Sequence, residues 1–354
     1  MQDELAVAES PALESGVDAL LEPLMADALA ALDGRAPLLA GMVRYHLGYV
    51  DLDLHPIDPR TIDRGKRIRP AVTLLVAGAA GGDPVQAAPV AAAIELLHNF
   101  TLIHDDIQDE SATRRHRPTV RHTWGDKQAI NAGDALFAVA HLPLFQLPAS
   151  GVSAERTIAI LDAFERMTIE IVEGQTLDLG FETREDVTAD AYLEMISGKT
   201  SAIIRFAAWA GATIAGADAT TAARWGDFGL ELGLGFQIHD DLLGVWGTQA
   251  ETGKRQADDI RRRKKSYPFL LLRERLDLST LAELNAIYAQ DDVSEKDVTR
   301  VLSLMDTRDV RRNVERVVTH YHDSAAAVLA NAARNPVYQR QLQALVESLA
   351  TRTS

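Results

Sequence analysis

Residues 102–118 read LIHDDIQDESATRRHRP and place three aspartates within five positions of an otherwise apolar, helical pattern. Residues four apart share a face of an α-helix, so Asp105 and Asp109 point the same way, with Asp106 beside them. Clustered carboxylates repel one another unless a cation compensates them, and oxygen ligands without His or Cys suit Mg²⁺. The stretch therefore predicts a magnesium site on a helix, with a solvated acidic turn as the alternative.

A second aspartate pair strengthens the first interpretation. Residues 233–247 read GLGFQIHDDLLGVWG and place Asp240 and Asp241 in an even more apolar helical pattern. Two buried acidic clusters without a cation would be strongly destabilising. If the two helices face each other across a bundle, a shared Mg²⁺ site that holds a diphosphate resolves the conflict.

The pattern outside these stretches is helical nearly everywhere, and no convincing alternating strand is present in the 354 residues. Hydrophobic residues make up 47% of the chain and charged residues 25%, which is ordinary for a globular protein. We expect a loosely ordered start over residues 1–15 and one all-α domain over residues 16–354. Expected helix breaks are Gly34, Gly81, Gly82, Pro118, Gly125, Pro148, Gly180, Gly198, Gly216, Gly247 and Pro268.

Charge and composition exclude several classes of protein. The net charge of −15 argues against nucleic acid and anionic membranes as partners. The absence of cysteine removes disulfides, thiolate metal sites and thiol nucleophiles, and it fits a cytoplasmic location. The first residues lack the pattern of a signal peptide, and the most apolar stretch is broken at residues 81–84, so no membrane span is expected.

Basic residues gather in several short runs, and each run alone is more typical of surface charge than of a binding site. The runs include RGKRIRP at 64–70, the arginine pair at 114–115, Lys199, Lys254, and RRRKKS at 261–266. Together they divide into cations that could complement a metal-bound diphosphate and cations that could hold a second diphosphate without metal.

Six motifs in a fixed order then resemble one family. GKRIRP, LLHNFTLIHDDIQD, TRRHRPT, GQTLD, GKT and GFQIHDDLLG occur between about residue 60 and residue 268. This set resembles the trans-isoprenyl diphosphate synthases, which make farnesyl, geranylgeranyl and longer prenyl diphosphates. The resemblance implies an all-α bundle of about a dozen helices around a deep central cavity, usually as a homodimer.

The reaction that the resemblance implies is head-to-tail chain elongation. Three Mg²⁺ ions, for which Mn²⁺ can substitute, would grip an allylic diphosphate and draw the diphosphate away. The double bond of isopentenyl diphosphate would attack the resulting cation, and a proton would then be lost. The residues agree with this reaction, because metals stabilise charge on a leaving group and an apolar wall excludes water.

The resemblance also implies a role for each matching residue. Asp105, Asp109 and Asp240 would bind metal directly, and Asp106 and Asp241 would support them. The isopentenyl diphosphate site would comprise Lys66, Arg69, His98 and Arg115. The allylic diphosphate would contact Arg114, Lys199, Lys254 and Lys264. Thr200 and Gln237 would lie near the developing cation, and Gln175 and Asp178 would line the same cavity. His104 and His239 are expected to be structural.

Four positions depart from the family pattern. Gly244 stands where the second motif usually ends in aspartate, which leaves the second metal cluster less well defined. Arg64, His116 and Arg263 stand where the family usually has glycine. Arg64 and His116 would add bulk or charge near the isopentenyl diphosphate site.

Product length is expected to depend on the helical turn before the first aspartates. Thr101 and Phe100 lie four and five residues before Asp105, below the metal cluster on the same face, with Leu97 deeper. An aromatic ring at the fifth position resembles geranylgeranyl (C20) producers more than farnesyl (C15) producers.

Two other functions stay open. A class I terpene cyclase shares the bundle and the aspartates, but it needs no isopentenyl diphosphate site. A non-catalytic subunit of a heteromeric synthase would usually lose the first aspartate cluster, which this chain keeps.

Overall fold

The computed structural model describes residues 10–249, 255–290 and 292–350. These residues are helical almost throughout, and their only sheet is an antiparallel hairpin of β1 (Thr113–Arg114) and β2 (Arg117–Pro118). The predicted all-α class is therefore confirmed. Residues 1–9 of the expected loosely ordered start lie outside the described residues, whereas residues 10–15 already belong to helix α1.

The chain divides into two compact units. The first comprises Met1–Asp162, Ala207–Ala222 and Ala333–Gln341, and the second comprises Ala163–Phe206, Ala223–Ala332 and Leu342–Ser354. Helices α7 (Ala154–Thr183), α9 (Ala202–Ile214), α10 (Ala219–Trp246) and α17 (Pro336–Ala350) contribute residues to both. The expectation of a single domain over residues 16–354 stays a prediction.

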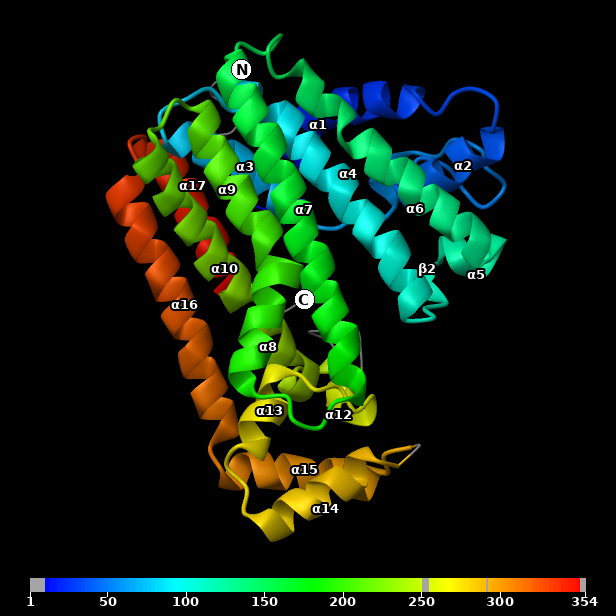
Figure 1. The fold of residues 1–354 in the computed structure, drawn as a ribbon, viewed down its shortest axis with the longest axis vertical. Coiled ribbons are helices and arrows are strands. Elements are labelled where there is room, and N and C mark those ends of the chain that lie inside the picture. The colour runs from blue at the N-terminus through cyan, green and yellow to red at the C-terminus, as the bar shows by residue number, and fades with distance from the viewer. Residues whose placement is uncertain (1–9, 250–254, 291, 351–354) are drawn as a thin grey trace. The chain divides into compact units, whose positions relative to one another are not determined.

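The first unit is built around helix α4 (Pro84–Gln108), which packs between α3 (Ile68–Ala79) and α6 (Asp126–Ala140), as Figure 1 shows. Its other elements are α1 (Ser10–Ala30), α2 (Pro37–His46), η1 (Pro59–Thr61), the β1–β2 hairpin, α5 (Val120–Trp124) and η2 (Leu142–Gln146). The alanines of α3 and α4 are buried and small, so these helices approach closely.

Local sequence sets both ends of α4. The side chain of Asp83 accepts a hydrogen bond from the Val85 amide at 3.0 Å, and Pro84 occupies the first turn, where it costs no hydrogen bond. The helix ends at Gln108, and Asp109 is the first residue after it. The predicted aspartates are therefore on the last turn and at the cap.

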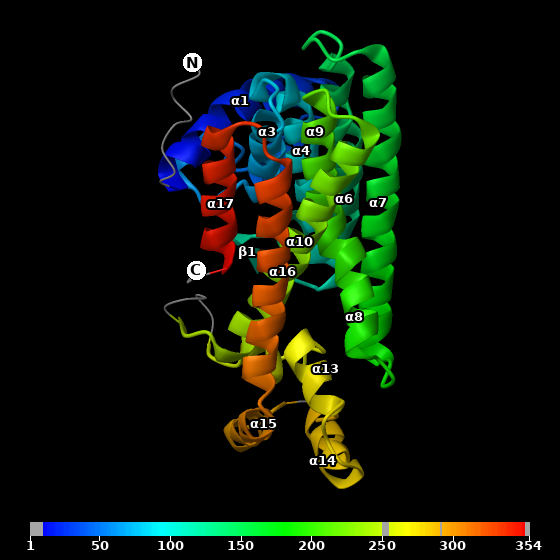
Figure 2. The same ribbon diagram turned by 90° about the vertical axis from the view of Figure 1, so that its left-hand side faces the viewer.

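The second unit contains α8 (Ala189–Ile196), the π-helical turn η3 (Ser197–Ser201), α12 (Asp258–Arg261), α13 (Tyr267–Arg273), α14 (Leu278–Tyr288), α15 (Glu295–Thr307) and α16 (Val310–Ala332). Figure 2 shows α14 and α15 beyond the end of α13. The long α16 packs against α13 and α15. Their apolar faces form one continuous core with α8 and the end of α10. The helix break predicted at Gly180 is wrong, because α7 continues to Thr183.

The described helices include none with the length and apolarity needed to cross a membrane.

A buried arginine ties three helices of the first unit together. Arg67, directly before α3, is 6% exposed and pairs with Glu95 of α4, which is 3% exposed. Its other nitrogens lie 3.3 Å from Asp18 and from Glu22 of α1. Buried charges are tolerated only when they are paired. The buried carboxylate of Glu95 therefore depends on the Arg67 guanidinium.

We predict that Arg67→Met destabilises the protein by about 3–5 kcal/mol, because Glu95 loses its buried counter-ion. Urea unfolding followed by circular dichroism measures the change. Arg60→Met is the control, since Arg60 pairs with Asp58 on the surface and its loss is expected to cost less than about 1 kcal/mol. Equal effects of the two substitutions would contradict the role given to Arg67.

Candidate active site

The first aspartate motif separates its carboxylates by burial. Asp106 is 1% exposed and accepts a hydrogen bond from Nε of Arg114 at 2.9 Å. Asp105 is partly exposed, and Asp109 is exposed at the helix cap. Burial raises the pKa of Asp106, while the Arg114 guanidinium lowers it. Asp106 is thus engaged within the protein, whereas Asp105 and Asp109 reach the surface at the end of α4.

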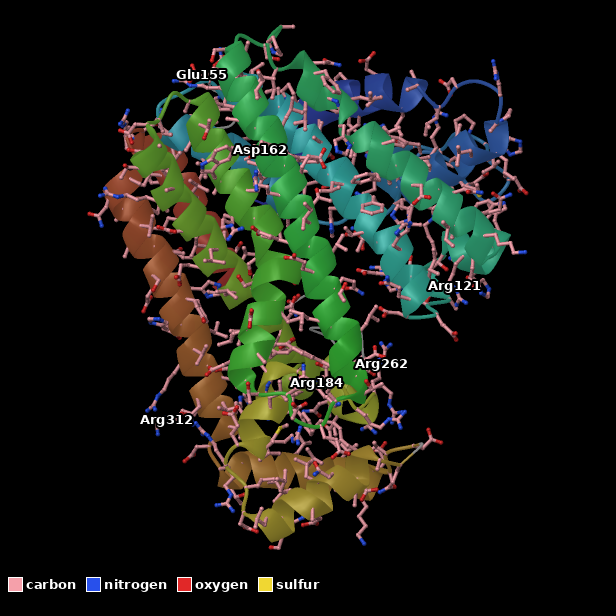
Figure 3. All side chains as sticks on the ribbon, in the orientation of Figure 1. Arg121, Glu155, Asp162, Arg184, Arg262 and Arg312 are labelled. Atoms are coloured by element: carbon pink, nitrogen blue, oxygen red, sulfur yellow. The ribbon has the colours of Figure 1, made fainter. Side chains whose placement is uncertain are left out.

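The β1–β2 hairpin presents the arginine pair. Arg114 is opposite Arg117 in the register, so Arg115 and His116 form the two-residue turn. Both have left-handed backbone conformations, with φ of 48° and 61°, as the tight twist of such a hairpin requires. The family's usual glycine at position 116 matches this conformation, and histidine adopts it at a conformational cost. Figure 3 labels Arg121 on α5, which follows the hairpin.

Arg115 lies against the glycine of the RGKR stretch. A side chain on Gly65 would meet the Arg115 guanidinium, so the available space favours glycine. Gly65 also has a φ of +81°, a conformation that favours glycine independently. Arg64 donates to the carbonyl oxygen of Leu47 at 3.0 Å and pairs with Glu22 at 2.7 Å. The charge that Arg64 was expected to add near this site is therefore balanced by the carboxylate of Glu22 on α1.

His98 and Arg69, both expected at the isopentenyl diphosphate site, are in direct contact. Nη1 of Arg69 lies 3.2 Å from Nε2 of His98. Burial lowers the pKa of His98 well below its ordinary value, and the guanidinium groups of Arg69 and Arg115 act in the same direction. His98 is therefore neutral and can accept a hydrogen bond from Arg69. Lys66, exposed just before α3, is the remaining predicted member of this group.

A small cavity of about 30 Å³ lies behind the arginine pair, lined in part by His46, Asp63, Asp106, Arg114 and Arg115. Nε2 of His46 is buried and has no hydrogen-bond partner within the described residues. The cavity has room for a bound water beside this nitrogen.

In the second unit, two glycines bring the GQTLD and GKT motifs together. A side chain on Gly174 of α7 would overlap the backbone of Lys199, and one on Gly198 would overlap the carbonyl of Glu170. The backbone at this crossing is the π-helical turn η3, a conformation found often at functional sites. Close approach of α7 and η3 is thus specified by glycine on both sides.

The crossing places the predicted residues in contact. Nζ of Lys199 donates to a carboxylate oxygen of Asp178, one turn after Gln175 on α7. Thr200 donates to Oε1 of Gln237 at 3.1 Å, and Gln237 in turn donates to Oδ1 of Asp241 at 3.1 Å. A continuous set of polar contacts therefore connects η3 to the second aspartate motif.

Asp241 is the centre of this network. It is 6% exposed, and its Oδ2 accepts from the Tyr192 hydroxyl at 2.7 Å and from the Tyr267 amide at 3.1 Å. Burial raises the pKa of Asp241 to about 7, and the nearby charge of Asp259 acts in the same direction. Its neighbour Asp240 is partly exposed. The second motif thus repeats the division of the first, with one carboxylate engaged by the protein and one reaching the surface.

Lys254 and Lys264 were both expected to contact the allylic diphosphate, and only Lys264 lies within the described residues. Lys264 is exposed, with Nζ 3.7 Å from Oδ1 of Asp259. Lys254 lies outside the described residues, so its predicted contact with the allylic diphosphate stays a prediction. Arg263 has a φ of 55°, which again matches the family's usual glycine at that position.

The residues expected to set product length lie on α4 below Asp105. Leu97 is fully buried, and Thr101 donates to the carbonyl of His98 at 2.8 Å. The Phe100 ring lies 5.1 Å from the Phe137 ring of α6 and 4.8 Å from the His104 ring, measured between centroids. His104 itself fills the space above Gly133 of α6, in agreement with a structural role.

Another acidic group lies away from both motifs. Asp51, Asp53 and His55 have ligand atoms close together on a surface loop. Oδ1 of Asp51 already accepts from the amides of Asp53 at 3.0 Å and His55 at 2.9 Å, so the group is explained by its own turn.

Sequence patterns missed several residues of these networks. Tyr192 precedes its partner Asp241 by 49 residues, and no motif joins them. Asp259 is a buried acid within a charged run, where composition predicts only surface. His46 ends an amphipathic helix, and no local pattern indicates that its side chain is buried. Gly174 is the first residue of the GQTLD motif, so the sequence did contain a signal for it.

Comparison with known proteins gives consistent matches. The family model described as polyprenyl synthetase matches residues 55–305. A (2E,6E)-farnesyl diphosphate synthase of Mycobacterium tuberculosis is 43% identical over 232 residues, covering 66% of this chain and 62% of that protein. The chain thus spans less than two thirds of this relative.

Two further matches cover more of the chain. A geranylgeranyl diphosphate synthase of Mycobacterium tuberculosis is 38% identical over 308 residues, covering 86% of this chain and 85% of that protein. The crystal structure of a polyprenyl synthetase from Streptomyces coelicolor A3(2) superposes with a TM-score of 0.85 at 32% identity, covering 96% of this chain and 99% of that one.

We predict that His46 makes the first unit sensitive to acid. Burial, followed by the charges of Arg114, Arg115 and Arg117, lowers its pKa to about 3 in the folded chain, compared with 6.5 ordinarily. The folded state binds fewer protons, so this stability is present above about pH 6.5 and is lost as the pH falls toward 3. Between pH 6 and 4 the free energy of unfolding should fall by about 1 kcal/mol per pH unit more than in His46→Gln.

Urea unfolding at a series of pH values measures this difference. His55→Gln is the control, because His55 is exposed on its loop and its replacement removes no buried side chain. Parallel profiles for the wild-type protein and His46→Gln would show that His46 is not held neutral.

Proposed function

The chain belongs to the polyprenyl synthetase family, and on that premise we propose that it condenses isopentenyl diphosphate head-to-tail with an allylic diphosphate. Its main product is proposed to be geranylgeranyl diphosphate (C20), with farnesyl diphosphate (C15) next. The observation that supports this most is the matched division of the two aspartate pairs. In each pair the second carboxylate is buried and hydrogen-bonded, while the first is partly exposed.

The carboxylates suit Mg²⁺, because each motif offers hard oxygen donors near the surface, while the preceding histidines are engaged elsewhere: His104 packs against Gly133 and His239 contacts the Leu349 carbonyl. Asp105, Asp109 and Asp240 would hold the ions, with Asp106 and Asp241 orienting the chain around them. When bound, the ions supply positive charge to the diphosphate leaving group of the allylic substrate. We propose three Mg²⁺ ions, with Mn²⁺ able to replace them.

The basic residues divide between the two diphosphates. In the first unit, Lys66, Arg69, His98 and Arg115 would bind isopentenyl diphosphate. Neutral His98 fixes the direction of the Arg69 guanidinium, and Gly65 leaves room for that of Arg115. Guanidinium groups held in this way bind phosphate oxygens by paired, charge-assisted hydrogen bonds. Arg114, Lys199, Lys254 and Lys264 would contact the allylic diphosphate.

Polar groups of the second unit would stabilise the cation that forms on the allylic substrate. Thr200 and Gln237 present oxygen atoms on one hydrogen-bonded chain, and Gln175 and Asp178 lie across the η3 crossing. Oxygen dipoles fixed before reaction stabilise positive charge without reorganisation. The buried apolar side chains of α8 and α10 would also limit water, which would otherwise quench the cation.

A homodimer is the proposed assembly. Ile169 and Val172, three residues apart on α7, are 57% and 53% exposed. Large apolar side chains exposed on one face of a helix are typical of surfaces that bind another protein. A cytoplasmic location also stays a prediction.

Product analysis tests the proposed reaction. Purified protein is incubated with Mg²⁺, isopentenyl diphosphate and, separately, dimethylallyl, geranyl or farnesyl diphosphate, and the chains are sized after dephosphorylation. We expect a C20 product that disappears with EDTA. Asp105→Ala and Asp240→Ala should each lower turnover at least about 100-fold, because each removes a carboxylate from the metal site.

Asp53→Ala is the matched control, since this exposed aspartate belongs to the surface loop and should not affect turnover. Cyclic hydrocarbons formed without consumption of isopentenyl diphosphate would favour a terpene cyclase instead. Metal-dependent diphosphate binding with no turnover would favour a non-catalytic subunit.

Chain length is proposed to depend on Phe100 and the α6 ring that supports it. Phe137 packs against Phe100 at a centroid separation of 5.1 Å and against His141 at 4.9 Å. A ring held by a second ring cannot move aside without breaking that contact. Phe100 would therefore end the space available to a growing chain near C20.

We predict that Phe100→Ala shifts the main product from C20 to longer chains, because the substitution removes the ring below Thr101. Phe137→Ala should produce a smaller shift in the same direction, since it removes only the support. Chromatography of the dephosphorylated products measures both. Phe145→Ala, which alters a 65% exposed ring on η2, should leave the product unchanged. An unchanged C20 product from Phe100→Ala would place the limit elsewhere.

A further inference from the structure

We propose that Asp259, on α12, supplies the carboxylate that the second aspartate motif lacks at Gly244. This inference rests on the proposed function, because the carboxylate would serve the metal-bound diphosphate of that reaction. It assigns to Asp259 a role in holding metal that the motif pattern gives to position 244.

The space at Gly244 is already filled by a carboxylate. A Cβ built on this glycine would lie far inside contact distance of the carboxylate carbon and both oxygens of Asp259. Gly244 has an ordinary helical backbone, so glycine is not required there for its conformation. What requires glycine is the approach of Asp259 to the surface of α10.

The position is the one that a third aspartate of the motif would use. Gly244 is four residues after Asp240 on α10, so the two share a face, with Cβ positions about 5–6 Å apart. The Asp259 oxygens occupy the direction in which a side chain at 244 would project. The second motif therefore has a third carboxylate at its end, contributed by a different helix.

The local backbone is held in an unfavourable conformation on both sides of Asp259. Helix α12 is a single turn, preceded by Ala257 with a φ of 57° and followed two residues later by Arg263 with a φ of 55°. A left-handed residue other than glycine carries a conformational cost. Strain of this kind is found where the surrounding structure fixes a functional geometry. Figure 3 labels Arg262, the residue directly after α12.

Burial of Asp259 also points to a cation. The residue is 8% exposed and lies near Asp241, so two carboxylates are buried in the same region. Nζ of Lys264, an exposed side chain, lies 3.7 Å from Oδ1 of Asp259. Carboxylates buried side by side are costly, and a bound divalent cation offsets that cost.

The test measures Mg²⁺ binding without turnover. Wild-type protein, Asp259→Asn and Asp258→Asn are titrated with Mg²⁺ in the presence of inorganic diphosphate, and binding is followed by calorimetry and by the rise in melting temperature. We expect Asp259→Asn to need about 10–100-fold more Mg²⁺, as for other residues that orient a metal site. Asp258→Asn, the neighbouring acid on the same turn, should match the wild-type protein.

Moving the carboxylate back to α10 gives a second test. Gly244→Asp alone should lower the melting temperature, because its side chain overlaps Asp259. The double variant Gly244→Asp with Asp259→Gly removes the overlap and restores a carboxylate, so its Mg²⁺ requirement should return to within about 3-fold of wild type. Recovery in the double variant would distinguish a metal role from a purely structural one.

The results separate this inference from the proposed function. If Asp259→Asn binds Mg²⁺ and diphosphate like wild type while the wild-type protein elongates prenyl chains, the inference is wrong and the function stands. If the Mg²⁺ requirement depends on Asp259 but no prenyl chain is ever elongated, the site stands and the proposed function is wrong.

Discussion

The buried carboxylate of Asp241 is the constraint around which the second unit is arranged. An ionised or protonated carboxyl group inside an apolar bundle must be hydrogen-bonded, and three elements meet to do this. Tyr192 comes from α8, Gln237 from α10 and the Tyr267 amide from the start of α13. Gln237 extends the network to Thr200 on η3. A rearrangement of α8 or α13 would remove Tyr192 or the Tyr267 amide from Asp241, so the carboxylate constrains how these helices meet α10.

The first unit meets the same constraint with different partners. Asp106 is buried at the end of α4, and Arg114 of the β1–β2 hairpin donates a hydrogen bond to it. Arg67 performs the equivalent task for Glu95, about three turns earlier on α4. In both aspartate pairs the engaged carboxylate holds the backbone in place, which leaves its neighbour oriented but accessible. This division explains why the motif contains two adjacent aspartates and not one.

The departures from the family pattern have separate physical explanations. His116 and Arg263 occupy left-handed positions where glycine is usual, so their cost is conformational. Arg64 is balanced by Glu22. Gly244 differs in kind, because the space that it leaves is filled by Asp259. A motif read from the chain alone counts Gly244 as a missing ligand, whereas the folded chain has a carboxylate at that place.

The sequence by itself determined the all-α class and the two aspartate motifs, because helical periodicity and short motifs are local properties. It could not give the hairpin that carries Arg114, the continuation of α7 through Gly180, or the partners Tyr192 and Asp259. Tyr192 and Asp259 reach Asp241 and Gly244 from segments far along the chain. Spacing along the chain carries no record of such contacts, and only the tertiary structure decided them.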